Sequence, residues 1–260
     1  ALAMALGSAG VTVDPGALDP LVFLPGRKGS LQVELQAAAR RHGRVPYRID
    51  SDLFAIHEEL SAGRPVLVLQ NFGLKMMPAY HYAVVIGLLG DHRVVLRSGK
   101  NRRLEMSERR FLLSWRRADA WAMVLLEPGE LPARPEPGRL VAALSAFEQS
   151  GHVEQAEKGY RTALSKWPDH PLFMFALGNN LLSQGKREEA EVLYRKIHRL
   201  YPDHVAAANN LADLLANKRC FPEAMAIIER ASLAAQRLGS PLKDTVRRTR
   251  AQIEAAWQKE

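Results

Sequence analysis

The pattern of apolar and polar positions divides the chain into a mixed first part and a helical second part. Up to about residue 127, short β-branched or alternating runs are bounded by Gly, Asn, Asp or Pro, which is typical of strands. These runs predict strands at residues 45–49, 65–70, 82–87, 93–97, 102–106 and 121–126. Periodic apolar positions predict helices at residues 1–9, 31–42, 52–62 and 108–116. Because several strands follow one another without a helix between them, we expect an α+β domain with a mostly antiparallel sheet.

Local signals indicate where these elements begin and turn. Ser30 and Ser51 precede two of the predicted helices, and each hydroxyl is expected to accept a hydrogen bond from a free amide of the first turn. Asp91 and His92 stand between two strand-like runs and predict a hairpin turn.

A proline-rich segment follows the first part. Residues 128–137 read PGELPARPEP and show no apolar periodicity. Such a composition is typical of a stiff, extended linker. We therefore predict a first domain at residues 1–127, a linker at 128–137 and a second domain at 138–260.

After Gly138 the sequence repeats with a period of 34 residues. The aligned positions are Phe147, Leu181 and Leu215; Gly151 and Gly185; Ala156, Ala190 and Ala224; Tyr160, Tyr194 and Ile228; Ala163, Ile197 and Ala231; and Pro168 and Pro202. Small residues allow two antiparallel helices to approach closely, large residues interlock, and proline ends the second helix. This is the tetratricopeptide pattern, and it predicts an all-α solenoid of about three repeats with a capping helix after Ser240.

The first helices of such repeats line a groove that binds peptides or proteins. Phe175, Asn179, Asn210 and Asp213 are the candidate groove residues. Asn179 and Asn210 match asparagines with which some tetratricopeptide proteins hold a peptide backbone or a C-terminal carboxylate. The basic residues of a carboxylate clamp are not matched, because Phe175 stands where a lysine would be. We therefore favour consensus asparagines over a carboxylate clamp, while expecting a peptide or protein ligand.

Composition narrows the possible classes of function. The net charge of +8 is distributed along the chain, and the densest basic stretch, residues 93–110, has no interleaved aromatic residues, so we do not expect nucleic-acid binding. No apolar run approaches the roughly 18 residues of a membrane span. Cys220 is the single cysteine, and the eight histidines show no spacing typical of a metal site. No metal and no cofactor is expected.

Four stretches of the first part carry a resemblance to a known family. They are ALAMALGSAG at 1–10, LPGRKGSLQVELQAAARRHG at 24–43, GRPVLVLQN at 63–71 and HYAVVIGL at 81–88. Together they resemble the bacterial double-glycine (bacteriocin-leader) cysteine peptidases, which are papain-like. The resemblance implies a papain-like fold for residues 1–127. It also implies a catalytic Cys in a Cys-Gly-Pro turn and an oxyanion-hole Gln, both upstream of Ala1 and both absent from this chain.

The same resemblance implies that His81 is the general base. An imidazole beside a cysteine takes the thiol proton and later protonates the leaving amine. The family's orienting Asp or Asn follows the next strand, where this chain reads VVLRSGKN and has no carboxylate. The remaining candidates to orient the ring are Ser98, which is a weak candidate, and Asn101. Arg97, expected beside the base, would disfavour the imidazolium.

Three interpretations therefore remain open. The protein is a cysteine peptidase whose first residues precede Ala1, a pseudo-peptidase that binds peptides without cleaving them, or an adaptor dominated by its repeats. The start of the chain inside a predicted helix favours the first. By resemblance, proteins that join these two modules are often exported, which implies a periplasmic or envelope location and envelope or secretion partners. We expect the chain as it stands to lack peptidase activity.

Overall fold

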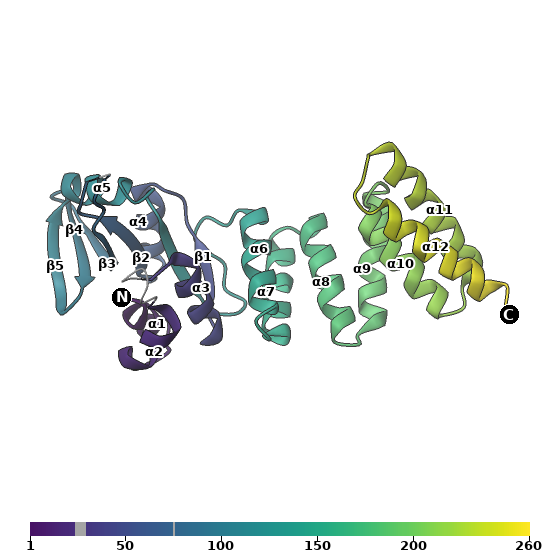
Figure 1. Ribbon diagram of the computed structural model, residues 1–260, viewed down its shortest axis with the longest axis horizontal. Helices are drawn as coiled ribbons and strands as arrows, with labels where there is room; N and C mark the ends of the chain where they lie inside the picture. The colour runs from purple at the N-terminus through teal and green to yellow at the C-terminus, as the bar shows by residue number, and fades with distance from the viewer. Residues whose placement is uncertain (24–29, 75) are drawn as a thin grey trace. The chain divides into compact units, whose positions relative to one another are not determined.

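The computed structural model describes residues 1–23, 30–74 and 76–260. The chain forms two compact units, Ala1–Thr162 and Ala163–Glu260 (Figure 1). Part of the stretch 24–43 that carries the family resemblance, residues 24–29, lies outside the described residues. Each unit is described separately below.

The first unit contains the α/β part and the first helical repeat. Its helices are α1 (Leu2–Ser8), α2 (Pro15–Val22), α3 (Gln32–Arg41), α4 (Leu53–Ser61), α5 (Glu108–Arg116), α6 (Pro137–Glu148) and the larger part of α7 (Val153–Lys166). Its strands are β1 (Val45–Arg48), β2 (Val66–Asn71), β3 (Tyr80–Leu89), β4 (Arg93–Ser98), β5 (Asn101–Ser107) and β6 (Ala122–Leu126).

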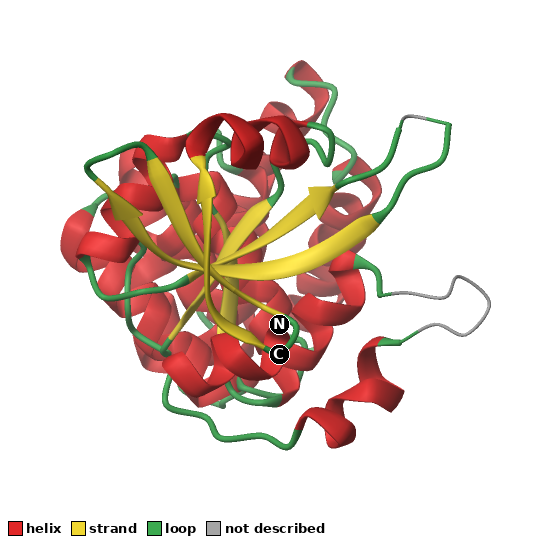
Figure 2. Cartoon of the chain, turned by 90° about the vertical axis from the view of Figure 1, so that its left-hand side faces the viewer, coloured by secondary structure: helices red, strands yellow, loops and turns green. Residues whose placement is uncertain are grey.

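The six strands form one antiparallel sheet. Their order is β1-β6-β2-β3-β4-β5, and Figure 2 shows the strands fanning out with a strong twist. Each neighbouring pair is antiparallel, and β3 carries a bulge between Val85 and Gly87 where it pairs with β4. The predicted α+β class with an antiparallel sheet is confirmed.

The two faces of the sheet are covered by different helices. Leu67, Val84 and Met123 lie side by side on one face and pack into an apolar core with α1 and α3. Gln70 points to the other face, because successive strand residues alternate, and its amide donates to Ser114 of α5 at 2.8 Å. α5 therefore lies on the face opposite to α1 and α3.

Two predicted helix caps were wrong, and one helix was missed. The first turn of α3 begins after Leu31, with no side-chain cap from Ser30. In α4 the cap is Asp52, whose carboxylate accepts from the Ala55 amide at 2.7 Å, so the neighbouring Ser51 is not used. Helix α2 was not predicted at all, since its Pro15, Gly16 and Pro20 read as turn residues.

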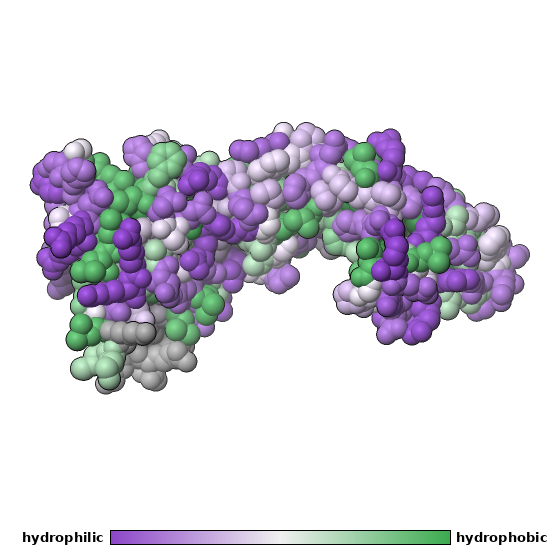
Figure 3. Space-filling view, turned by 90° about the horizontal axis from the view of Figure 1, so that it is seen from above, coloured by the Kyte–Doolittle hydropathy of each residue, from purple (hydrophilic) through white to green (hydrophobic). Residues whose placement is uncertain are grey.

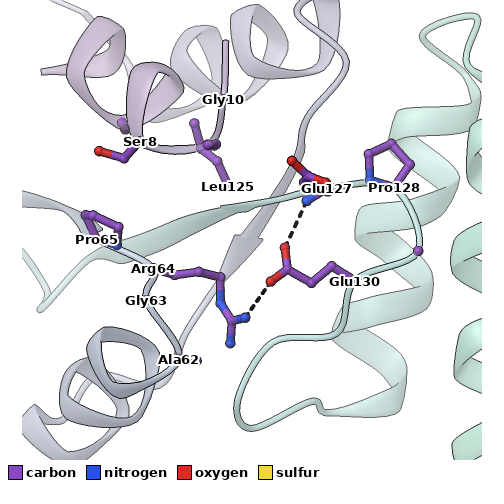
Figure 4. A pocket seen from close by; sticks show the side chains of 13 residues that line it. Ser8, Gly10, Ala62, Gly63, Arg64, Pro65, Leu125, Glu127, Pro128 and Glu130 are labelled. Carbon is purple, nitrogen blue, oxygen red and sulfur yellow. Dashed lines mark hydrogen bonds and ion pairs between the residues drawn. The ribbon is translucent and has the colours of Figure 1, made fainter.

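The proline-rich segment after β6 is held against the α/β part. Glu130 accepts from Arg64 at 2.6 Å and from the Glu127 amide at 3.1 Å, as Figure 4 shows at the wall of a cavity of about 690 Å³. Arg64 also bonds Glu59, whose second oxygen accepts from the Ala133 amide at 2.8 Å. These bonds tie the segment predicted as a linker to α4, and α6 continues the attachment by packing on β1. The domain boundary placed at residues 128–137 stays a prediction.

The second unit is helical throughout. Beyond the end of α7 it contains α8 (Pro171–Ser183), α9 (Arg187–Leu200), α10 (Val205–Asn217), α11 (Phe221–Arg237) and α12 (Lys243–Trp257). α8 packs on α9, α10 on α11, and α12 covers α10 and α11 as the predicted capping helix. None of the helices in the described part of the chain is both long and apolar enough to cross a membrane.

The apolar positions of the repeat alignment are buried, whereas the aligned glycines and prolines at the turns are exposed. Ala156, Ala190 and Ala224 are 0% exposed, as are Tyr160, Tyr194 and Ile228. The turn between the two helices of each repeat contains a residue with positive φ: Gly151, Gly185 and Arg219. A non-glycine residue costs about 1–2 kcal/mol in that conformation, so the third repeat carries a strain that the first two avoid.

Replacing Ala190 with leucine is expected to destabilise the second unit by about 1–3 kcal/mol. Ala190 is fully buried where α9 packs on α8, so a larger side chain forces the helices apart. Urea denaturation followed by circular dichroism measures the change. The control is Val192→Leu on the same helix, because Val192 is 66% exposed and should tolerate the change. Equal stability of the two variants would contradict the helix packing described here.

Candidate functional site

His81 lies near the beginning of β3 and lines a cavity that also reaches the start of α1. The cavity has a volume of about 930 Å³. Its described lining consists of Ala1, Leu2, Asp19, Val22, Ser30, Leu31, Leu35, Pro78, Ala79, Tyr80, His81 and Tyr82. Residues 1 and 81, distant in sequence, therefore line the same cavity. This is the placement expected if a nucleophile ahead of Ala1 is to reach His81.

Ser98, at the end of β4, is in contact with His81. The Nε2 atom of the imidazole lies 2.7 Å from the Ser98 hydroxyl oxygen. Both side chains also line a smaller cavity of about 410 Å³ on the β4–β5 side, with Phe72, Leu104, Met106 and Arg110. His81 thus stands between two cavities. The structure brings the two predicted site residues together, while their roles stay predictions.

Burial controls the charge of the imidazole. It lowers the pKa of His81 below the ordinary value of 6.5. Arg97 is exposed and pairs across the sheet with Val84 of β3. The expectation that Arg97 acts on the base stays a prediction. Burial therefore favours the uncharged imidazole of His81, the form that is able to accept a proton.

Asn71 fixes the loop that leads into His81. It is 4% exposed, and its side-chain oxygen accepts from the amides of Gly73 and Ala79, each at 2.9 Å. The two amides lie on opposite arms of the loop, so Asn71 closes the loop at its base. A polar residue at the end of an apolar strand was the only signal of this role.

The second candidate site lies on the repeats and joins two of them. The Asn179 side-chain oxygen on α8 accepts from the Tyr194 hydroxyl at 2.7 Å and from the Asn210 amide at 3.0 Å. Asn210 belongs to α10, so this bond connects the first helices of adjacent repeats. Phe175 lies one turn before Asn179, with its ring centroid 6.1 Å from that of Tyr194 and 5.0 Å from that of His204.

Asp213 follows Asn210 by one helical turn. It is exposed, and both its carbonyl and its carboxylate accept from the Asn217 amide, at 2.9 and 3.3 Å. It makes no recorded contact with Phe175, Asn179 or Asn210, although it shares the helix face of Asn210. The structure thus brings three of the four predicted groove residues together, and the fourth, Asp213, lies one helical turn further along α10.

The described residues contain no cluster of three or more His, Cys, Asp or Glu side chains that could hold a metal ion. Cys220, at the start of α11, is exposed and not near His81 in sequence, and it belongs to the other unit. Neither candidate site therefore has a recorded thiol.

Comparison with known proteins identifies the repeats. Residues 141–197 and residues 181–241 each match a tetratricopeptide repeat family. A solved structure, the type III secretion translocator chaperone SycD of Yersinia enterocolitica, shares 19% identity with a TM-score of 0.43 and covers 48% of this chain and 88% of that chain. Comparison with curated proteins found no match. The C-terminal region therefore contains tetratricopeptide repeats, which supports a protein-binding role.

Proposed function

We propose that this protein binds a peptide or protein ligand through its repeats and carries, in its first unit, a peptidase-like cleft of the double-glycine type. The cavity shared by His81 and Ala1, with His81 bonded to Ser98, is the observation that carries the second part. The family's papain-like fold and its substrate class come from the sequence resemblance alone. A periplasmic or envelope location with secretion partners belongs to the same proposal.

The chemistry of the cleft follows from the His81–Ser98 contact. A serine oxygen can accept the Nε2 proton of a neutral imidazole, which leaves the Nδ1 lone pair free to take a thiol proton. A cysteine ahead of Ala1 would supply that thiol. Ser98 is neutral, so it orients the ring without stabilising the imidazolium as a carboxylate would. We therefore propose a slow peptidase rather than an efficient one.

The groove is proposed to hold the backbone of an extended peptide. Asn179 uses its oxygen for Tyr194 and Asn210, so its amide hydrogens face the exposed side and can donate to a peptide carbonyl. Phe175, half-buried beside Tyr194 and His204, offers an apolar contact. Because Asp213 adds a negative charge, the groove favours neutral or basic peptides over a C-terminal carboxylate.

The double variant Asn179→Ala/Asn210→Ala is expected to weaken peptide binding about tenfold, the loss of roughly two hydrogen bonds. An array of diverse 15-residue peptides, probed with the labelled full chain, identifies bound sequences, and titration of their synthetic copies gives the Kd. The matched control is Gln236→Ala, which removes an exposed side-chain amide from α11 of the same unit. If the peptides bind the double variant as tightly as they bind the unchanged chain, the ligand binds elsewhere.

A non-catalytic adaptor or pseudo-peptidase is the second candidate. The absence of a carboxylate at the orienting position, taken by Ser98, favours it. In that case the His81 cleft would hold a peptide without cleaving it. The cleavage experiment described in the Discussion separates the two.

A further inference from the structure

The outer face of α5 is an exposed surface with no role in either proposed site. Phe111, Ser114 and Trp115 face the sheet and are buried. The opposite side of the helix presents Leu112 and Leu113, and Leu113 is 55% exposed. Figure 3 looks down on this end of the first unit and shows hydrophobic groups among hydrophilic ones. Because α5 packs on the sheet through its other side, packing on the sheet does not explain this apolar strip.

The strip lines a hollow instead of protruding. The hollow has a volume of about 680 Å³ and is formed by His92, Glu108, Arg109 and Arg116 around Leu112 and Leu113, with Arg117 at its end. The β3–β4 turn is fastened to the helix start, because the Glu108 amide donates to the His92 carbonyl at 2.8 Å. The shape is therefore preformed, which lowers the entropy cost of binding a partner.

The rim of the hollow is positively charged. Among the described residues, no carboxylate lies within ion-pair distance of Arg109, Arg116 or Arg117. The one acidic lining residue, Glu108, has its carboxylate 3.4 Å from the His92 ring. Three arginines thus line the same hollow as two leucines, and Arg117 also donates to the Gly73 carbonyl at 3.3 Å. Arginine can bind carboxylates in a bidentate manner and is enriched at protein interfaces.

We propose that this α5 surface docks an acidic protein segment that carries a bulky apolar side chain. The apolar side chain enters the hollow beside Leu113, and the flanking Asp or Glu residues pair with Arg109, Arg116 and Arg117. A membrane surface fits less well, because insertion requires apolar side chains that protrude. A nucleic acid fits less well, because an apolar floor and Glu108 offer nothing to phosphates.

A selection experiment on the full chain tests this surface directly. Phage-displayed random peptides of about 12 residues are first depleted on the double variant Leu113→Asp/Arg116→Glu and then selected on the unchanged chain. We expect the survivors to combine Asp or Glu with Leu, Ile, Phe or Met. Synthetic copies should bind the unchanged chain at least tenfold more tightly than the variant, and less tightly as salt rises. Arg102→Glu, an exposed arginine of β5, should change the Kd less than twofold.

Other outcomes overturn the proposal. Survivors without acidic residues, or no survivors at all, would show that the surface does not select this chemistry. The double variant could instead weaken the binding of a single-stranded oligonucleotide or of phosphatidylglycerol vesicles as strongly as it weakens peptide binding. That result would assign the surface to those ligands. Both substituted positions are exposed, and a thermal melt verifies that the variant folds. If it does not fold, Arg109→Glu replaces it in the same selection.

Discussion

Replacing His81 with alanine is expected to slow peptide cleavage at least about a hundredfold in a chain extended ahead of Ala1 by a segment that contains the family's oxyanion-hole Gln and ends in Cys-Gly-Pro-Ala. The extension supplies a thiol four residues upstream, where the family resemblance puts it. His81 shares a cavity with Ala1 and is the imidazole positioned to accept the thiol proton. A fluorogenic double-glycine peptide measures the rate.

Two controls and a pH profile make this test specific to His81. His57→Ala, which alters an exposed histidine of α4, should leave the rate unchanged. Ser98→Ala should slow cleavage less than His81→Ala, because Ser98 only orients the ring. Burial lowers the pKa of His81, so the midpoint of its protonation lies below the ordinary value of 6.5. The rate should therefore fall on the acid side below pH 6.5. Equal rates for His81→Ala and the unchanged extended chain would exclude His81 as the base.

Replacing Trp115 with alanine is expected to destabilise the first unit by about 3–5 kcal/mol. Trp115 is 1% exposed, its ring stacks on Phe111 with centroids 5.4 Å apart, and its Nε1 donates to the Trp121 carbonyl at 2.9 Å. The substitution removes a large apolar side chain from between α5 and the sheet, together with one of the two hydrogen bonds that the Trp121 carbonyl accepts; the Leu69 amide still donates to it at 3.1 Å.

Urea denaturation measures this effect as a shift in the transition of the first unit. Leu113→Ala is the matched control, because it alters the same helix on its exposed side and should cost less than about 1 kcal/mol. Trp115→Phe keeps most of the packing and should fall between the two. A Trp115→Ala variant as stable as Leu113→Ala would contradict the placement of α5 on the sheet.

The sequence predicts the elements well wherever a period is sustained. All six strands lie where alternating or β-branched runs predict them, and the repeat period identifies the buried positions, such as Ala190 and Tyr194. Single capping residues and α2 were harder to predict. Competing polar neighbours, such as Ser51 and Asp52, differ little in intrinsic preference, and the local geometry decides between them.

Contacts within the sites depend on register and could be predicted only in part. The repeat phase puts Asn179 and Asn210 on first helices, but their hydrogen bond depends on how α8 and α10 are spaced. The His81–Ser98 contact depends on the pairing of β3 with β4, which a bulge near Val85 shifts. The periodicity of a sequence does not indicate where a bulge occurs, so this shift could not be predicted. The α5 hollow could not be foreseen either, because it needs the β3–β4 turn beside the helix.

The most direct test of the account is mass spectrometry of a double-glycine leader peptide incubated with the extended chain. The account predicts a product cut after the second glycine, formed slowly, and none with the chain that begins at Ala1. It also predicts that iodoacetamide, which alkylates the added thiol, stops the reaction. An intact peptide, with the extended chain folded and its thiol free, would contradict the peptidase-like cleft and leave the adaptor function in its place.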